Sequence, residues 1–169
     1  MKLIERLRDF LFGSPQMSLL HYSLLAFAIS ILPGTILSGT GILVAEFLGY
    51  DSSILSGKSY PLDLANLLRT VVVAPVLETL MLALLMGFLS TMFKRELVVV
   101  TLSALLWGVL HGLLGPLRFF GTAWAFFVFS SAFLVWSRKS FSSGLLAAGI
   151  PHVLQNLAVM GFLIIESLV

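Results

Sequence analysis

The chain has 169 residues, of which 59% are hydrophobic and only 11% are charged. A soluble domain carries about 25% charged residues, so this composition does not fit a water-soluble body of this size. It also excludes a disordered chain and, with a net charge of only +2, a nucleic-acid-binding domain. The absence of cysteine excludes a disulfide framework and thiolate chemistry. A polytopic membrane protein remains, which we expect to be one domain over residues 1–169.

Residues 1–12 are predicted to form an amphipathic helix that lies at the membrane surface. Their apolar side chains fall on one helical face and their charged side chains on the other. A secretory signal peptide fits poorly, because acidic residues stand near the start and no clear small-residue cleavage site follows a short apolar core.

Five apolar segments follow, over residues 17–48, 64–93, 97–117, 119–136 and 144–168. A membrane-spanning helix needs about 20 apolar residues, and these runs lack the alternating polarity of barrel strands. The predicted fold class is therefore an all-α transmembrane helix bundle with about five spans and an N-terminal interfacial helix. The first segment contains Pro33 and is long enough for one kinked helix or for two short ones.

The distribution of basic residues favours one kinked crossing. With the N-terminus in the cytoplasm, seven lie on the inner side (Lys2, Arg6, Arg8, Lys94, Arg95, Arg138 and Lys139) and three on the outer side (Lys58, Arg69 and Arg118). This asymmetry obeys the positive-inside rule, whereas two crossings would move the basic residues at 94–95 and 138–139 outside. We therefore predict a multi-pass protein of the cell membrane, with its C-terminus and the loop over residues 49–63 outside.

Four polar residues whose side chains could take part in a reaction lie within the spans: Glu78, His111, His152 and Asn156. An ionisable group in hydrocarbon is costly and is by default a functional candidate. From the basic residues at the inner ends of their helices, the four lie 16, 16, 13 and 17 residues away. At about 1.5 Å per residue, all of them lie at roughly 20–26 Å from the inner interface. Three helices therefore bring them to one level.

Two mechanisms of amide hydrolysis fit this set. In the first, the Glu78 carboxylate takes a proton from water, hydroxide attacks the carbonyl, and imidazole and carboxamide donors stabilise the oxyanion. In the second, Glu78, His111 and His152 bind a catalytic zinc ion and leave one position for water. A serine-type mechanism is less favoured, because no serine is clearly paired with a histidine.

Other residues are expected to support this group. Trp107 shares a helix face with His111, and Gly108 with the glycine four residues later allows a neighbouring helix to approach closely. Pro75 frees a backbone carbonyl in mid-membrane, which is tolerated where a cavity or neighbouring groups satisfy it. Arg69 either snorkels to the headgroups or meets a carboxylate of the substrate.

Three motifs resemble those of a known family. Residues 74–79 (APVLET) resemble A-P-x-x-E-E-x-x-x-R, residues 107–111 (WGVLH) resemble F-x-x-x-H, and residues 152–156 (HVLQN) match H-x-x-x-N/D. In this order they are similar to the CAAX protease and bacteriocin-processing (CPBP, or ABI) family of intramembrane proteases. That family includes the type II CAAX prenyl endopeptidases. The resemblance covers about residues 72–157.

The resemblance implies roles for these residues. Glu78 would be the base that activates water, His111 would orient that water, and His152 with Asn156 would stabilise the oxyanion. It implies no cofactor under the favoured metal-free mechanism, and a membrane-anchored protein or a C-terminal sorting or CAAX-like tail as substrate. Thr79 and an alanine at 83 replace the usual second Glu and the Arg, and Trp107 replaces the usual Phe.

Two other functions are weighed against the protease. The departures at 79 and 83 suggest a noncatalytic scaffold or immunity-type relative. A proton-coupled transporter would also use intramembrane ionisable groups, but the sequence shows no evident inverted repeat.

Overall fold

The chain folds into a bundle of helices. The computed structural model describes residues 2–51, 53, 55 and 61–168; Lys58 and much of the loop expected over residues 49–63 lie outside them. The elements are α1 Lys2–Phe12, α2 Leu19–Phe47, α4 Leu64–Leu68, a π-helical turn η1 Arg69–Val73, α5 Ala74–Met92, α6 Glu96–Gly112, α7 Arg118–Ser137 and α8 Phe141–Glu166. Within these described ranges every regular element is helical, which confirms the predicted fold class.

Four helical segments are long and apolar enough to cross a membrane: Leu19–Phe47, Leu64–Met92, Arg118–Ser137 and Phe141–Ile165. The first runs through Pro33 as one helix, as predicted. The segment expected over residues 97–117 is represented by α6, which is shorter, with 17 residues. This length is at the lower end of what spans a bilayer. Helix α6 ends at Gly112, ahead of Gly115 and Pro116, which break a helix.

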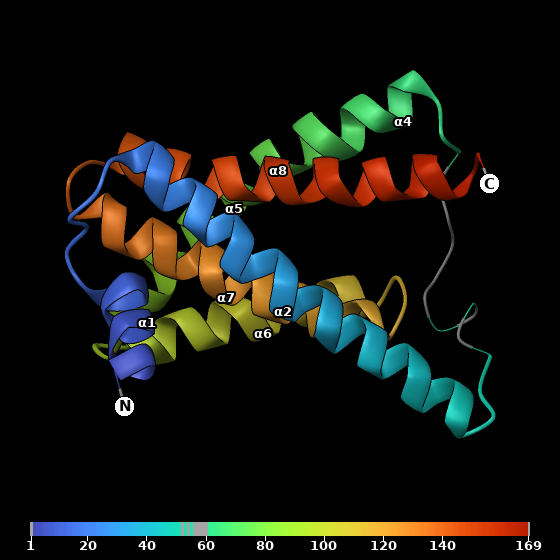
Figure 1. Cartoon of the computed structure of the whole chain (residues 1–169). Helices are drawn as coiled ribbons and strands as arrows, with labels where there is room; N and C mark the ends of the chain where they lie inside the picture. The colour runs from blue at the N-terminus through green and yellow to red at the C-terminus, as the bar shows by residue number, and fades with distance from the viewer. Residues whose placement is uncertain (1, 52, 54, 56–60, 169) are drawn as a thin grey trace.

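Helix α7 lies at the centre of the bundle, packed against α2, α6 and α8 (Figure 1). Its buried Phe126, Phe129 and Phe133 form one core cluster with residues of α5, α6 and α8. A Cβ atom on Gly108 of α6 would lie only 2.8 Å from the Cβ of Ala123 in α7. The close helix approach expected at Gly108 is therefore confirmed, and α7 is the partner.

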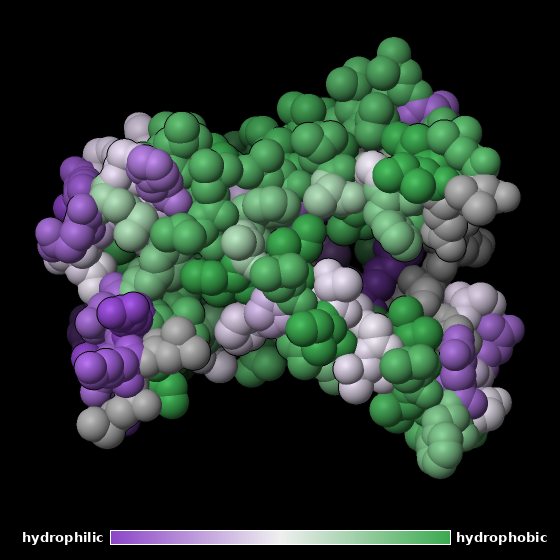
Figure 2. Space-filling view, viewed as in Figure 1, coloured by the Kyte–Doolittle hydropathy of each residue, from purple (hydrophilic) through white to green (hydrophobic). Residues whose placement is uncertain are grey.

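Helix α1 is attached to one end of the bundle by Arg138, which follows α7. The Arg138 guanidinium donates a hydrogen bond to the Phe12 carbonyl at 3.1 Å and pairs with the Glu96 carboxylate at 2.6 Å. The Tyr22 hydroxyl also donates to the carbonyl of Phe10, at 3.2 Å. Hydrophilic residues gather at both ends of the visible face, with a hydrophobic band between them (Figure 2). The structure therefore brings α1 to the end where α6 begins and α7 stops.

A side chain of another helix repairs the backbone at Pro33. Proline has no N–H to donate to the carbonyl of Ile29, four residues earlier. The Trp124 indole Nε1 of α7 donates to that carbonyl at 2.8 Å. A proline in a membrane helix is tolerated when its orphaned carbonyl finds such a donor.

Candidate functional site

The Glu78 carboxylate lies between two histidines from other helices. Its Oε2 atom is 3.4 Å from Nε2 of His152 in α8 and 3.8 Å from Nε2 of His111 in α6. The Glu78 and His111 side chains are partly exposed, at 23% and 26%, whereas the His152 side chain is only 5% exposed. The structure thus brings together three of the four polar residues that the sequence placed at one depth.

His152 is fixed from several sides. Its ring stacks on Phe129, with centroids 4.9 Å apart, and meets the edge of Phe126 at 5.2 Å. Its Nδ1 atom lies 3.5 Å from the hydroxyl of Thr79. When that hydroxyl donates to Nδ1, the ring proton is on Nε2, the nitrogen that faces Glu78. Neither phenylalanine was expected from the sequence, in which apolar periodicity cannot distinguish a site-facing ring from any other buried one.

His111 is oriented by its own helix. Its Nδ1 lies 3.0 Å from the backbone carbonyl of Trp107, four residues earlier. Because a carbonyl oxygen only accepts, Nδ1 carries the proton. In the neutral ring Nε2 is then an acceptor, and it is this atom that faces Glu78. Trp107 stacks on Phe126 with centroids 4.5 Å apart, which holds the carbonyl and both rings in one packed layer.

Asn156 donates a hydrogen bond to the backbone of another element. Its Nδ2 donates to the carbonyl oxygen of Thr70 at 2.8 Å, and Thr70 belongs to η1, the turn that precedes α5. This contact lies on the N-terminal side of Glu78 rather than on the carboxylate itself. Arg69 opens the same turn, directly before Thr70 in the chain, and its side chain is exposed.

The two departures from the family motif lie in buried positions. Thr79 is 5% exposed, and its hydroxyl lies 3.5 Å from Nδ1 of His152. Ala83 is also 5% exposed and belongs to the apolar core with Leu82 and Met86. The two positions therefore hold a neutral hydroxyl and a methyl group.

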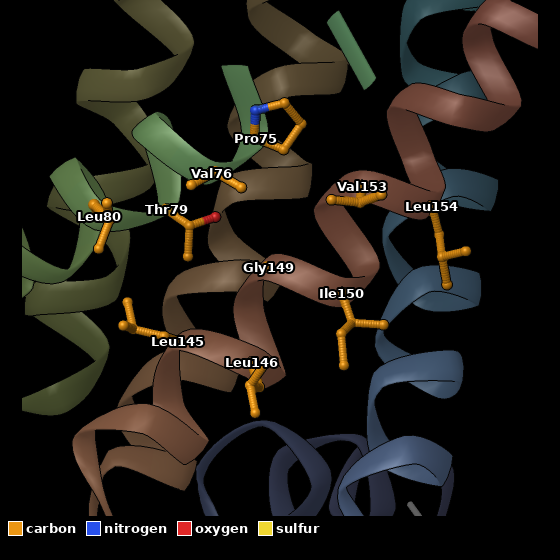
Figure 3. A pocket seen from close by; sticks show the side chains of 10 residues that line it. All are labelled: Pro75, Val76, Thr79, Leu80, Leu145, Leu146, Gly149, Ile150, Val153 and Leu154. Carbon is orange, nitrogen blue, oxygen red and sulfur yellow. The ribbon is translucent and has the colours of Figure 1, made fainter. Parts of the chain in front are cut away.

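An apolar cavity of about 390 Å³ opens between α5 and α8. Figure 3 shows its walls, with Pro75, Val76 and Thr79 on one side and Gly149, Ile150 and Val153 on the other. Thr79 is the polar side chain of this wall, and its hydroxyl also contacts His152. Thr79 therefore both lines the cavity and contacts the histidine.

The arrangement places one carboxylate where it can exchange a proton. Among the residues that the structure describes, no group of three or more His, Asp or Glu side chains is arranged to hold a metal ion. One carboxylate oxygen instead faces two imidazole nitrogens, in a bundle whose surroundings are apolar. Such a set can accept a proton and orient a small polar molecule.

Comparison with known proteins supports the resemblance drawn from the motifs. The model of the type II CAAX prenyl endopeptidase Rce1-like family matches residues 60–158, more than half of the chain and including all three motifs. No curated protein and no solved structure matches the chain. Four apolar helices together with this match make it a multi-pass membrane protein. The chain belongs to the Rce1-like family of type II CAAX prenyl endopeptidases.

Proposed function

We propose that this protein is an intramembrane endopeptidase in which Glu78 activates the water that attacks the peptide bond. The observation that carries the proposal is the position of Glu78 Oε2, 3.4 Å and 3.8 Å from the Nε2 atoms of His152 and His111. Burial of a carboxylate inside an apolar bundle is unfavourable, so such a group is by default a candidate for function. Because the chain belongs to a family of proteases, the function that fits this carboxylate is catalysis.

In the proposed reaction, Glu78 takes a proton from water as the water oxygen bonds to the peptide carbonyl carbon. The carbonyl electron pair moves to oxygen, and Nε2–H of His152 stabilises this oxyanion. His111 Nε2 accepts a hydrogen bond from the water and so orients it. Protonated Glu78 then gives its proton to the peptide nitrogen as the C–N bond breaks, which returns Glu78 to the carboxylate and releases an acid and an amine.

We propose a membrane-anchored protein or peptide with a CAAX-like or sorting tail as the substrate. The family description reads type II CAAX prenyl endopeptidase, and a CAAX tail carries an isoprenoid on its cysteine. An anchored substrate meets the bundle from within the bilayer, and the apolar lining of the α5/α8 cavity suits that environment.

We propose that the N-terminus lies in the cytoplasm and the C-terminus outside. The support is the excess of basic residues at the end of the bundle that carries α1. Arg138 joins α1 to that end through its contacts with Phe12 and Glu96.

The test is cleavage of a prenylated peptide ending in a CAAX box by the purified protein in liposomes. Glu78→Gln keeps the size of the side chain and removes the base, and a base contributes about 10²–10⁴-fold to rate. Glu96→Gln is the matched control, because Glu96 pairs with Arg138 at the end of the bundle. We expect Glu78→Gln to lose cleavage and Glu96→Gln to keep it. Cleavage by Glu78→Gln at the wild-type rate would refute the mechanism, and an inactive wild-type protein would favour the scaffold.

A further inference from the structure

We propose that Asn156 is a positioning residue: its amide supplies the hydrogen bond that Pro75 cannot make, and thereby holds the turn that leads to Glu78. This inference rests on the proposed function, because it explains how the proposed base is held. It differs from the role that the family motif implies for Asn156, which is direct contact with the oxyanion.

The register of η1 shows which carbonyl Pro75 leaves without a partner. The N–H of Ala74 donates to the carbonyl of Arg69, five residues earlier, which is the spacing of a π-helix. The next donor in this spacing is residue 75, and its acceptor is the carbonyl of Thr70. Residue 75 is proline and has no N–H. The π turn therefore presents the Thr70 carbonyl without its helical donor.

Asn156 supplies the missing donor from another helix. Its Nδ2 lies 2.8 Å from the Thr70 oxygen, at a partly buried position between α8 and η1. A buried carbonyl without a hydrogen-bond donor is unfavourable, because it has lost water and gained no other partner. The hydrogen bond thus stabilises the π turn, in which the Thr70 carbonyl would otherwise lack a donor.

The same helix holds both sides of the proposed site. Asn156 lies one turn after His152 on the same face of α8. His152 faces the Glu78 carboxylate, and Asn156 holds η1, directly before the α5 turn that carries Glu78. A shift of η1 along α8 would therefore change the separation between Glu78 and His152.

The Pro33 region provides an internal comparison. There too a proline removes the donor to an earlier carbonyl, that of Ile29, and the Trp124 indole supplies it at 2.8 Å. The two arrangements share the same chemistry, but α2 carries none of the residues proposed for the reaction. Loss of the Trp124 bond should therefore lower stability without changing the catalytic step.

The experiment is a double-mutant cycle between Asn156→Leu and Pro75→Ala, measured with a prenylated CAAX peptide in liposomes. Pro75→Ala restores an N–H to the turn, which gives the helix its own donor. We expect Asn156→Leu to lower kcat by about 10²-fold with KM little changed, as a misplaced base would. In the Pro75→Ala protein, the same Asn156→Leu change should lose most of that effect.

The matched control is the cycle between Trp124→Phe and Pro33→Ala, in which we expect coupling in Tm and no change in kcat. Asn156→Leu and Pro75→Ala should also be coupled in Tm, a readout that needs no substrate. This readout separates the inference from the proposed function, which Glu78→Gln tests independently. If the Asn156→Leu protein does not accumulate, the variant that combines Asn156→Leu with Pro75→Ala tests the inference instead. Its kcat should match that of Pro75→Ala alone.

Two results would overturn the inference. An equal loss of kcat from Asn156→Leu with and without Pro75→Ala would place Asn156 on the reacting carbonyl. A lower Tm with unchanged kcat would make Asn156 a stabilising residue without a positioning role.

Discussion

The Oε2 atom of Glu78 and the Nε2 atom of His152 lie 3.4 Å apart, and the two side chains differ in their access to the surroundings. His152 is 5% exposed and enclosed by aromatic rings, whereas Glu78 is 23% exposed. The imidazole ring is therefore the more tightly packed member of the pair, with Nε2 directed at Glu78, and the carboxylate is the more accessible member.

Replacement of His152 should remove stabilisation of the oxyanion. We expect His152→Gln to lower kcat by about 10²–10³-fold, the usual loss when one oxyanion donor is removed. Single-turnover cleavage of a prenylated CAAX peptide measures the effect. His21→Gln is the control, because His21 is exposed at the start of α2 and bonds to Ser18. Equal rates for His152→Gln and the wild type would exclude the oxyanion role.

Thr79 should matter through its hydroxyl. Thr79→Val keeps the shape and removes the group that lies 3.5 Å from Nδ1 of His152, whereas Thr79→Ser keeps it. A lost hydrogen bond of about 1 kcal/mol corresponds to roughly a fivefold lower kcat. We expect this loss for Thr79→Val and near wild-type cleavage for Thr79→Ser. Equal rates for the two variants would exclude the role of the hydroxyl, and a loss in Thr79→Ser alone would assign the orientation of the histidine to the methyl group.

The fold was largely predictable because hydropathy and charge act over whole segments. Apolar runs bounded by basic residues located the membrane helices, and counting from those residues placed Glu78 level with His111 and His152. The end of α6 at Gly112 was missed by five residues, since the apolar run continues past the helix.

The finer contacts could not be predicted in the same way. Pro75 predicted an orphaned carbonyl, but not that the π register would make it the carbonyl of Thr70 or that Asn156 would bind it. Likewise, Phe126 and Phe129 enclose His152 because of how α7 rotates against α8. Such rotations depend on packing between distant segments, which no local pattern encodes.

Removal of metal ions should leave cleavage unchanged. The proposed base and donors are protein groups, and the described residues contain no group arranged to hold a metal. We expect the same rate before and after incubation with a chelator such as 1,10-phenanthroline. A loss that added zinc restores would instead support the zinc mechanism with Glu78, His111 and His152 as ligands.

Two glycines should respond differently to a methyl group. In Gly108→Ala the new Cβ would lie 2.8 Å from the Cβ of Ala123, so α6 and α7 must move apart. Overpacking of this kind costs about 1–3 kcal/mol. In Gly149→Ala the nearest atom is Thr79 Cγ2 at 3.7 Å, an ordinary contact. Thermal unfolding in detergent should show a lower Tm for Gly108→Ala alone; a similar Tm for both variants would contradict the close packing.

The proposed membrane orientation can be tested by labelling single introduced cysteines, because the chain has no cysteine of its own that must first be removed. Ser14→Cys places a thiol between α1 and α2, and Tyr50→Cys places one beyond the other end of α2; both positions are exposed. A membrane-impermeant maleimide added to intact cells should label Tyr50→Cys and should reach Ser14→Cys only after lysis. The physical reason is that basic residues near α1 are attracted to the anionic inner leaflet. Labelling in the opposite order would place α1 outside and reverse the proposed topology.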